Sequence, residues 1–281
     1  MTLRTDASSL FPEAEQQQHL FRSSARYQAR FFGLFRVTLD QQPLGEPGWR
    51  RNKARTLLKW FLLNPGDLFE IGQLARLLWP QATASSAVSN LHVTIHYLRH
   101  MLEPELATGR PSTFIRRNRH NYYWFELNDA WWTDALDAHS LRSRFKEAAQ
   151  VGEISQATAL ANQLLAYYEL KFLPEDVYED LFASFRRQHE YAHLQLLEQL
   201  IESCAVAEHY DDALSYALRM RVLDPYSEIA VRTIAHIHLL QGNTTAAIRQ
   251  IDTFQRFLKQ DMGVDPGEEL LSMRHDILKV L

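Results

Sequence analysis

Five polar side chains recur along one segment that the sequence predicts to be helical. They are Ser89, Asn90, His92, His96 and Arg99. Asparagine pairs with adenine and arginine with guanine through two hydrogen bonds each, which gives about 1–3 kcal/mol of base discrimination. No acidic residue stands between Pro80 and Met101, as expected for a helix that approaches phosphates. The pattern favours a DNA recognition helix over an ordinary surface helix.

A second group of cations follows in an aromatic segment, 114–127, whose alternation predicts a β-hairpin with its tip at 117–121. The cations are Arg116, Arg117 and Arg119, and Asn121 closes the tip. These residues fit a wing that contacts phosphates or the adjacent minor groove. The alternative is that the arginines only keep a strand edge soluble.

A third group of cations, Arg50, Lys53 and Arg55, stands at the start of a predicted helix. Cations are mildly disfavoured at this end of a helix by its dipole, which is a weak argument for an external anion. We therefore expect these residues to hold backbone phosphates.

The sequence offers little for catalysis or for a metal. His92, His96 and His100 are four residues apart, but the glutamate of a zinc protease helix is absent and no partner ligand is apparent. Neither a glycine-rich phosphate loop nor a convincing acid/base pair of carboxylates is evident. We expect no enzyme activity, no metal and no cofactor.

The elements around these residues predict an α+β winged helix-turn-helix domain over residues 29–127, after a polar tail at 1–28. Aromatic and β-branched residues at 31–39 predict a short antiparallel sheet. Apolar residues at helical spacing predict three helices, from about Asn52 to Asn64, over 71–78, and from about Ser85 to Leu102. The aromatic hairpin then completes the domain.

Residues 128–281 predict a second, all-α domain of the tetratricopeptide-like kind. Amphipathic helices recur there, and Ala213 and Ala247 stand 34 residues apart in similar surroundings. Stacked helix pairs form an α-solenoid whose concave face commonly takes up a peptide, a helix or a small ligand.

Charge divides the chain in the same place. Residues 1–127 hold 16 Lys+Arg against 10 Asp+Glu, and residues 128–281 hold 14 against 24. A basic first part and an acidic second part favour a polyanion partner for the first alone. The single cysteine excludes an intramolecular disulfide, and no apolar run approaches the ~20 residues of a membrane span. We expect a cytoplasmic protein with no membrane contact.

The chain resembles the SARP-like regulators, which join an OmpR-type winged helix to a bacterial transcriptional activation domain (BTAD). The resemblance rests on Lys53–Leu58, Leu74–Trp79, Ala87–His92 with Leu98–Leu102, and Met262–Leu270. Two departures stand out: Asn121-Tyr122 replaces the family's usual Gly-Tyr in the wing, and the third helix is rich in histidine.

The resemblance implies a DNA-binding regulator, usually an activator. Family members bind direct repeats near promoters as dimers and recruit RNA polymerase, so double-stranded DNA, RNA polymerase and a second copy of the chain are the expected partners. Two alternatives remain open at this point. One is a sensor in which a small-molecule effector in the helical domain controls DNA binding, and the other is a scaffold without DNA binding.

Overall fold

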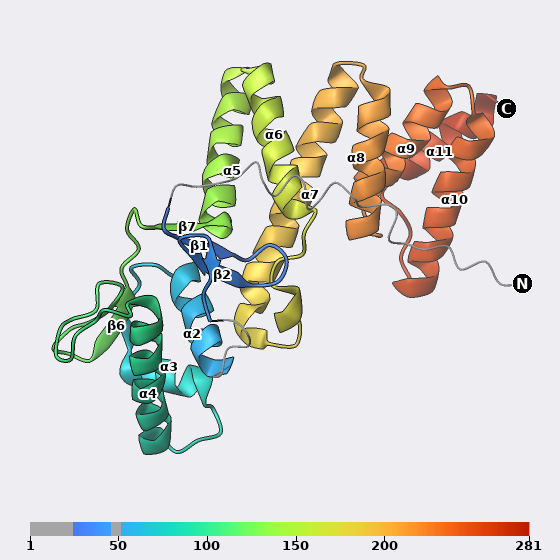
Figure 1. Ribbon diagram of the computed structural model, residues 1–281. Helices are drawn as coiled ribbons and strands as arrows, with labels where there is room; N and C mark the ends of the chain where they lie inside the picture. The colour runs from blue at the N-terminus through green and yellow to red at the C-terminus, as the bar shows by residue number, and fades with distance from the viewer. Residues whose placement is uncertain (1–24, 46–51, 281) are drawn as a thin grey trace, which may run out of the picture. The chain divides into compact units, whose positions relative to one another are not determined.

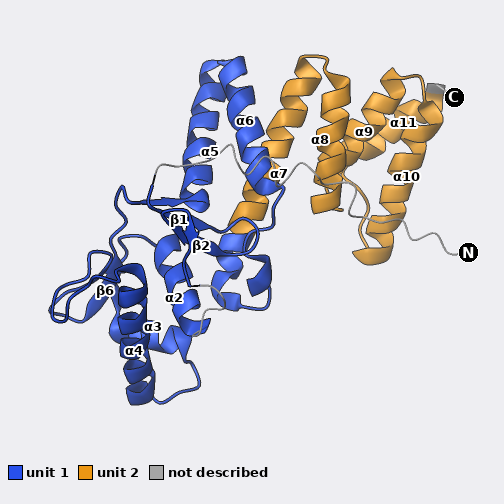
Figure 2. Ribbon diagram, in the orientation of Figure 1, with its two compact units in different colours: residues 1–186 blue, residues 187–281 orange. Residues whose placement is uncertain are grey.

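The computed structural model describes residues 25–45 and 52–280 (Figure 1). The polar tail at 1–28 therefore lies almost wholly outside the described residues, as does Arg50. Contacts divide the chain into two compact units, 1–186 and 187–281 (Figure 2). The first unit extends well beyond residue 127, so it contains the winged helix and the first helices that follow it.

The first unit begins with a four-stranded sheet of order β3-β2-β1-β7. Its strands are β1 (Tyr27–Arg30), β2 (Arg36–Leu39), β3 (Gln42–Pro43) and β7 (Trp131–Thr133). β1 is antiparallel to β2, as the sequence predicts, and parallel to β7. The fourth strand was not expected, because Trp131 and Trp132 lie in the stretch assigned to the helical domain.

Three helices follow, as predicted: α2 (Asn52–Leu63), α3 (Ile71–Leu78) and α4 (Ala84–Leu102). Thr83 caps α4 by accepting a hydrogen bond from the Ser86 amide, and Glu70 with Gln73 forms a capping box on α3. Their apolar faces form the core of the domain. Fully buried members include Leu57, Leu58, Phe61, Leu74, Leu91 and Leu98.

The predicted wing is present as a three-stranded sheet of order β4-β6-β5. Its strands are β4 (Phe69–Glu70), β5 (Ile115–Arg117) and β6 (Tyr122–Phe125). Phe125 and Tyr123 are buried against the helices, so the inner face of the hairpin is fixed to the domain while its tip projects.

A helical hairpin completes the first unit: α5 (Asp134–Val151) and α6 (Ile154–Tyr168). Gly152 lies between them with φ of 78°, the left-handed conformation that suits glycine at a helix C-terminus. Two short 3-10 turns follow, η2 (Pro174–Asp176) and η3 (Asp180–Phe182). α7 (Ala183–Val206) then begins in the first unit and continues into the second.

The second unit is all-helical: after α7 come α8 (Tyr210–Leu223), α9 (Glu228–Leu240), α10 (Thr244–Asp261) and α11 (Glu268–Val280). Ala213 and Ala247, the pair 34 residues apart, are both fully buried. Small residues at these positions let neighbouring helices approach closely, which is the packing that the repeat predicts. None of the helices within the described ranges is long and apolar enough to cross a bilayer.

Candidate nucleic-acid interface

Helix α4 has one buried and one exposed face. Its buried side chains are Ala87, Leu91, Thr94, Ile95, Leu98 and Leu102. Its exposed side chains include Ser85, Ser86, Ser89, Asn90, His92, Val93, His96 and His100. The exposed face therefore combines hydroxyl, amide and imidazole groups without any carboxylate, as a helix in the major groove requires.

Four of the five predicted base-contacting residues are on this face. Asn90, His92 and His96 are exposed, and Ser89 is exposed while its hydroxyl donates to the Ser85 carbonyl at 3.0 Å. That bond uses the hydroxyl proton and leaves the oxygen lone pairs to accept from a base.

The histidines form a pair of closely packed, tilted rings rather than a chelate. The rings of His96 and His100 lie 4.2 Å apart, and His100 Nδ1 is 3.0 Å from the carbonyl of His96. Across the described residues, no cluster of three or more His, Cys, Asp or Glu side chains is placed to hold a metal ion. The pair instead presents ring nitrogens along the exposed face.

Val93 is a residue that the sequence reasoning did not select. It stands at the middle of α4, and 49% of it is exposed. At helical spacing its exposed neighbours on the face are Ser89, Asn90 and His96, none of which is apolar. An apolar β-branched side chain in this setting has the chemistry to contact a thymine methyl group. The signal in the sequence was one apolar residue among polar ones on the predicted outer face.

The wing tip is a tight turn at 118–121. The Asn118 side-chain oxygen accepts from the amides of His120 and Tyr122, and the Asn118 amide donates to the Tyr122 carbonyl. Asn121 has φ of 64°, a left-handed conformation that glycine and asparagine tolerate best. Asparagine can therefore occupy the position where the resembled family has glycine, and the turn is retained.

The three wing arginines are exposed, Arg119 in this turn and Arg116 and Arg117 at the end of β5. Arg117 donates to the Asn121 side chain, and its guanidinium lies 5.5 Å from the centre of the Tyr123 ring. Arg116 makes a long contact of 3.4 Å with the Ser112 carbonyl. These contacts are neutral or aromatic, so they leave the positive charges without a carboxylate partner at hydrogen-bond distance among the described side chains.

Arg99 has a different position from the one expected of a base-contacting residue. Its Nε and Nη2 donate to the Ile115 carbonyl at 3.1 and 2.7 Å, and its guanidinium lies over the Tyr123 ring at 6.0 Å. Burial lowers the pKa of this side chain, as expected for a guanidinium removed from water. The geometry makes Arg99 a link between α4 and β5, which orients the helix relative to the wing.

Among the three cations expected to hold phosphates near the start of α2, Arg55 differs from expectation. Arg55 donates to the Phe35 carbonyl and pairs with Glu175, both at 2.9 Å, so its charge is neutralised inside the first unit. Lys53 is half-buried at the start of the helix. Arg50 lies outside the described residues. Lys53 is therefore the one described member of this group that still fits the predicted phosphate contact.

Arg55 belongs to a buried ionic joint that connects α2 to the segment after α6. Lys59, only 1% exposed, pairs with Glu175 at 2.9 Å and with Asp176. Burial acts to raise the pKa of Glu175, but the hydrogen bonds from Lys59 and from backbone amides outweigh it and hold the pKa below its ordinary value. Glu175 is therefore ionised and compensated, and its pairing and that of Asp176 with Lys59 fix α2 to η2.

A second buried carboxylate makes a similar connection at the sheet. Asp134, at the start of α5, accepts from the amides of Phe31 and Phe32 at 2.8 to 3.0 Å. Burial raises the pKa of Asp134 to about 7, although these amide donors oppose the change. Nearby, Phe31 stacks on Phe172 and the Gly33 amide donates to the Lys171 carbonyl. The winged helix and the first helical hairpin thus share one packed core.

Comparison with known proteins gives one family model, the bacterial transcriptional activator domain, which matches residues 133–278. Among curated proteins, the regulatory protein AfsR of Streptomyces griseus is 23% identical over 233 residues, which are 81% of this chain and 22% of that protein. The chain therefore spans about a fifth of the length of this relative.

Among solved structures, Mycobacterium tuberculosis EmbR in complex with a low-affinity phosphopeptide is similar, with a TM-score of 0.71 and 18% identity. The match covers 90% of this chain and 65% of that one. At this identity the likeness shows the fold: an N-terminal region of sheets and helices followed by an all-helical region.

Proposed function

The chain belongs to the family of SARP-type regulators that carry a bacterial transcriptional activator domain, and from this premise we propose that it is a sequence-specific DNA-binding activator. It binds double-stranded DNA at promoter-proximal repeats as a homodimer and recruits RNA polymerase. The observation that carries the proposal is the carboxylate-free outer face of α4 beside a wing of exposed arginines.

We assign base contacts to the outer face of α4. Asn90 suits adenine, Val93 suits the methyl group of thymine, and Ser89, His92 and His96 have donors and acceptors for other base edges. With Arg99 held by the Ile115 carbonyl, the described part of this face offers no arginine for guanine. The proposed operator therefore contains A·T pairs at the centre of the contact.

We assign phosphate contacts to the wing and to the start of α2. Arg116, Arg117, Arg119 and Lys53 are the described cations that fit this role, and Asn121 holds Arg117 in place. Arg50 retains the role expected from the sequence. Arg55 and Arg99 act in positioning, because their guanidinium groups are engaged inside the first unit.

Fluorescence anisotropy tests the proposal directly. The intact chain is titrated against duplexes selected from random DNA by the chain itself and against scrambled duplexes of the same composition, over a range of salt concentrations. We expect tighter binding to the selected duplex at moderate salt and a steep log–log salt dependence. Equal binding to both duplexes would show that the chain does not select a DNA sequence. No binding even at low salt would favour the alternative of a protein-interaction scaffold.

A further inference from the structure

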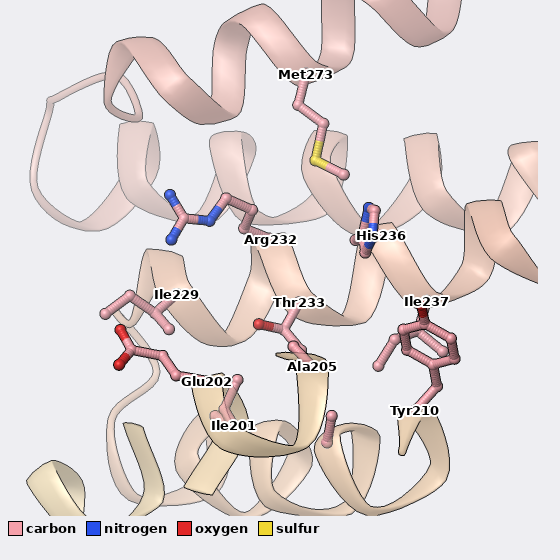
Figure 3. A pocket seen from close by; sticks show the side chains of 11 residues that line it. Ile201, Glu202, Ala205, Tyr210, Ile229, Arg232, Thr233, His236, Ile237 and Met273 are labelled. Carbon is pink, nitrogen blue, oxygen red and sulfur yellow. The ribbon is translucent and has the colours of Figure 1, made fainter. Parts of the chain in front are cut away.

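The second unit contains a hollow of about 430 Å³ that the proposed DNA contacts do not use. It opens between α7, α8, α9 and α11 (Figure 3). A hollow of this size lies in the range of ligand sites in proteins, and stacked helix pairs commonly bind partners on such a face.

The hollow has an apolar floor with polar groups around it. Ile201, Ala213 and Ile237 are buried in the floor. Figure 3 shows Met273 reaching in from the opposite side and the side chains of Glu202 and Arg232 toward one end. The site is therefore suited to apolar side chains that are followed by a charged group.

A second hollow, of about 320 Å³, continues from the charged end. The two share Ile229 and Arg232, so together they form one groove along α9. The second hollow is lined by Glu228, Ile229, Arg232, Gly267, Glu268, Glu269 and Leu270. A groove of this extent suits a chain segment better than a compact small molecule.

The charged side chains of the groove indicate which kind of segment it binds. Arg232, the cation of the lining, is paired with Glu269, so its charge is already compensated. Glu202 and Glu268 are exposed, and the described residues provide neither with an ion pair. Residues 187–281 as a whole hold 9 Lys+Arg against 14 Asp+Glu. The groove therefore attracts a cationic partner and repels an anionic one.

We propose that this groove, defined by the linings of the two hollows, docks a basic amphipathic segment of a partner protein. Apolar side chains of the segment fill the 430 Å³ hollow, and its Lys or Arg side chains meet Glu202 and Glu268. The docking does not depend on DNA binding by the first unit. A chain that binds no DNA can therefore still dock the segment, and a chain that docks no segment can still bind DNA.

The test uses the intact chain and two labelled peptides of about 14 residues, both with leucine at helical spacing. One peptide has lysine at its polar positions and the other has glutamate. Anisotropy should show saturable binding of one lysine peptide per chain, at least about tenfold tighter than the glutamate peptide. Equal binding of the two peptides would overturn the charge assignment.

Filling the hollow separates docking from general attraction to an acidic surface. Ala205 is exposed and lines the hollow, so Ala205→Trp places a large side chain in it without disturbing the core. Ser203→Trp is the matched control, because Ser203 is an exposed residue of the same helix outside the lining. Affinity for the lysine peptide should fall about tenfold in the first variant and stay unchanged in the second.

Further variants test the two glutamates and the filling of the hollow separately. Glu202→Gln with Glu268→Gln should weaken the lysine peptide and flatten its salt dependence, whereas Glu190→Gln should not. Should Ala205→Trp lower the thermal midpoint, Ala205→Leu provides a milder filling. Equal affinity in the filled and wild-type chains would overturn the proposal. So would a thermal shift with a small apolar molecule combined with no peptide binding, which would favour the ligand-sensor alternative.

Discussion

The wing and the ionic joint contain the same kinds of residues in opposite situations. Arg116, Arg117 and Arg119 are exposed in the wing hairpin, where Arg116 and Arg117 contact neutral groups and an aromatic ring. Arg55 and Lys59 are directed inward, where Glu175 and Asp176 compensate them. A cation acts on an external polyanion only when the fold has not already neutralised it, so the wing suits DNA and the joint suits stability.

The joint should give the largest effect on stability. Replacing Lys59 by methionine leaves Glu175 and Asp176 without their buried partner, so the free energy of unfolding should fall by about 3–5 kcal/mol. Urea denaturation measures the change. Lys53→Met, on the same helix but half-buried, is the control and should change stability by less than about 0.5 kcal/mol. Equal stability of Lys59→Met and wild type would show that the joint contributes nothing.

Asp134, the buried carboxylate at the sheet, should make the stability of the first unit sensitive to pH. Because burial raises its pKa in the folded state to about 7, above the unfolded value near 4, its contribution to stability is complete below about pH 4. That contribution should be lost as the pH rises toward 7, by about 1.4 kcal/mol per unit. Denaturation curves between pH 5 and 7 should show this slope in wild type and a flatter one in Asp134→Asn. Parallel curves would show that Asp134 does not titrate in this window.

Replacing Arg99 should have an intermediate effect, because this side chain orients α4 relative to the wing. Arg99→Ala removes two charged hydrogen bonds to the Ile115 carbonyl, at a cost of about 1.5–3 kcal/mol. We expect weaker binding to every duplex by a similar factor, together with a lower thermal midpoint. Anisotropy on duplexes that differ only at G·C positions measures this. A loss confined to particular guanines would instead restore Arg99 as a base-contacting residue.

Arg99 and Arg55 also show where sequence reasoning stops. Periodicity predicted α2, α3, α4 and the wing correctly, because apolar spacing and turn residues are local signals. The partner of a polar side chain is not local: Ile115 is 16 residues from Arg99, and Glu175 is 120 residues from Arg55. β7 was missed for the same reason, since a parallel strand is defined by the strand beside it.

The wing arginines should alter DNA affinity and leave stability unchanged. Each of Arg116→Ala, Arg117→Ala and Arg119→Ala should weaken all duplexes evenly and lower the salt slope by about 1. The free energy of unfolding should stay within about 0.5 kcal/mol of wild type. Arg110→Ala, an exposed residue outside the hairpin, is the control. An unchanged salt slope in all three variants would show that the wing arginines do not contact DNA phosphates.

Replacing Val93 should have the smallest effect on DNA affinity, and that effect should depend on a single thymine methyl group. A thymine methyl packed against this side chain contributes about 0.8 kcal/mol, or roughly fourfold in affinity. Replacing thymine by deoxyuridine removes that methyl without changing base pairing. Val93→Ala should therefore weaken the thymine duplex, and the same substitution should have little effect on the uracil duplex.

The cycle of two proteins and two duplexes isolates the contact, because any general loss cancels between them. Val151→Ala, an exposed valine at the end of α5, should leave all four affinities as in wild type. If Val93→Ala weakens both duplexes equally, its side chain lies away from the methyl group and the A·T assignment at the centre of α4 is wrong. If only the thymine duplex responds, one apolar residue on a polar helix face selects bases, while the wing cations bind phosphates without selecting among them.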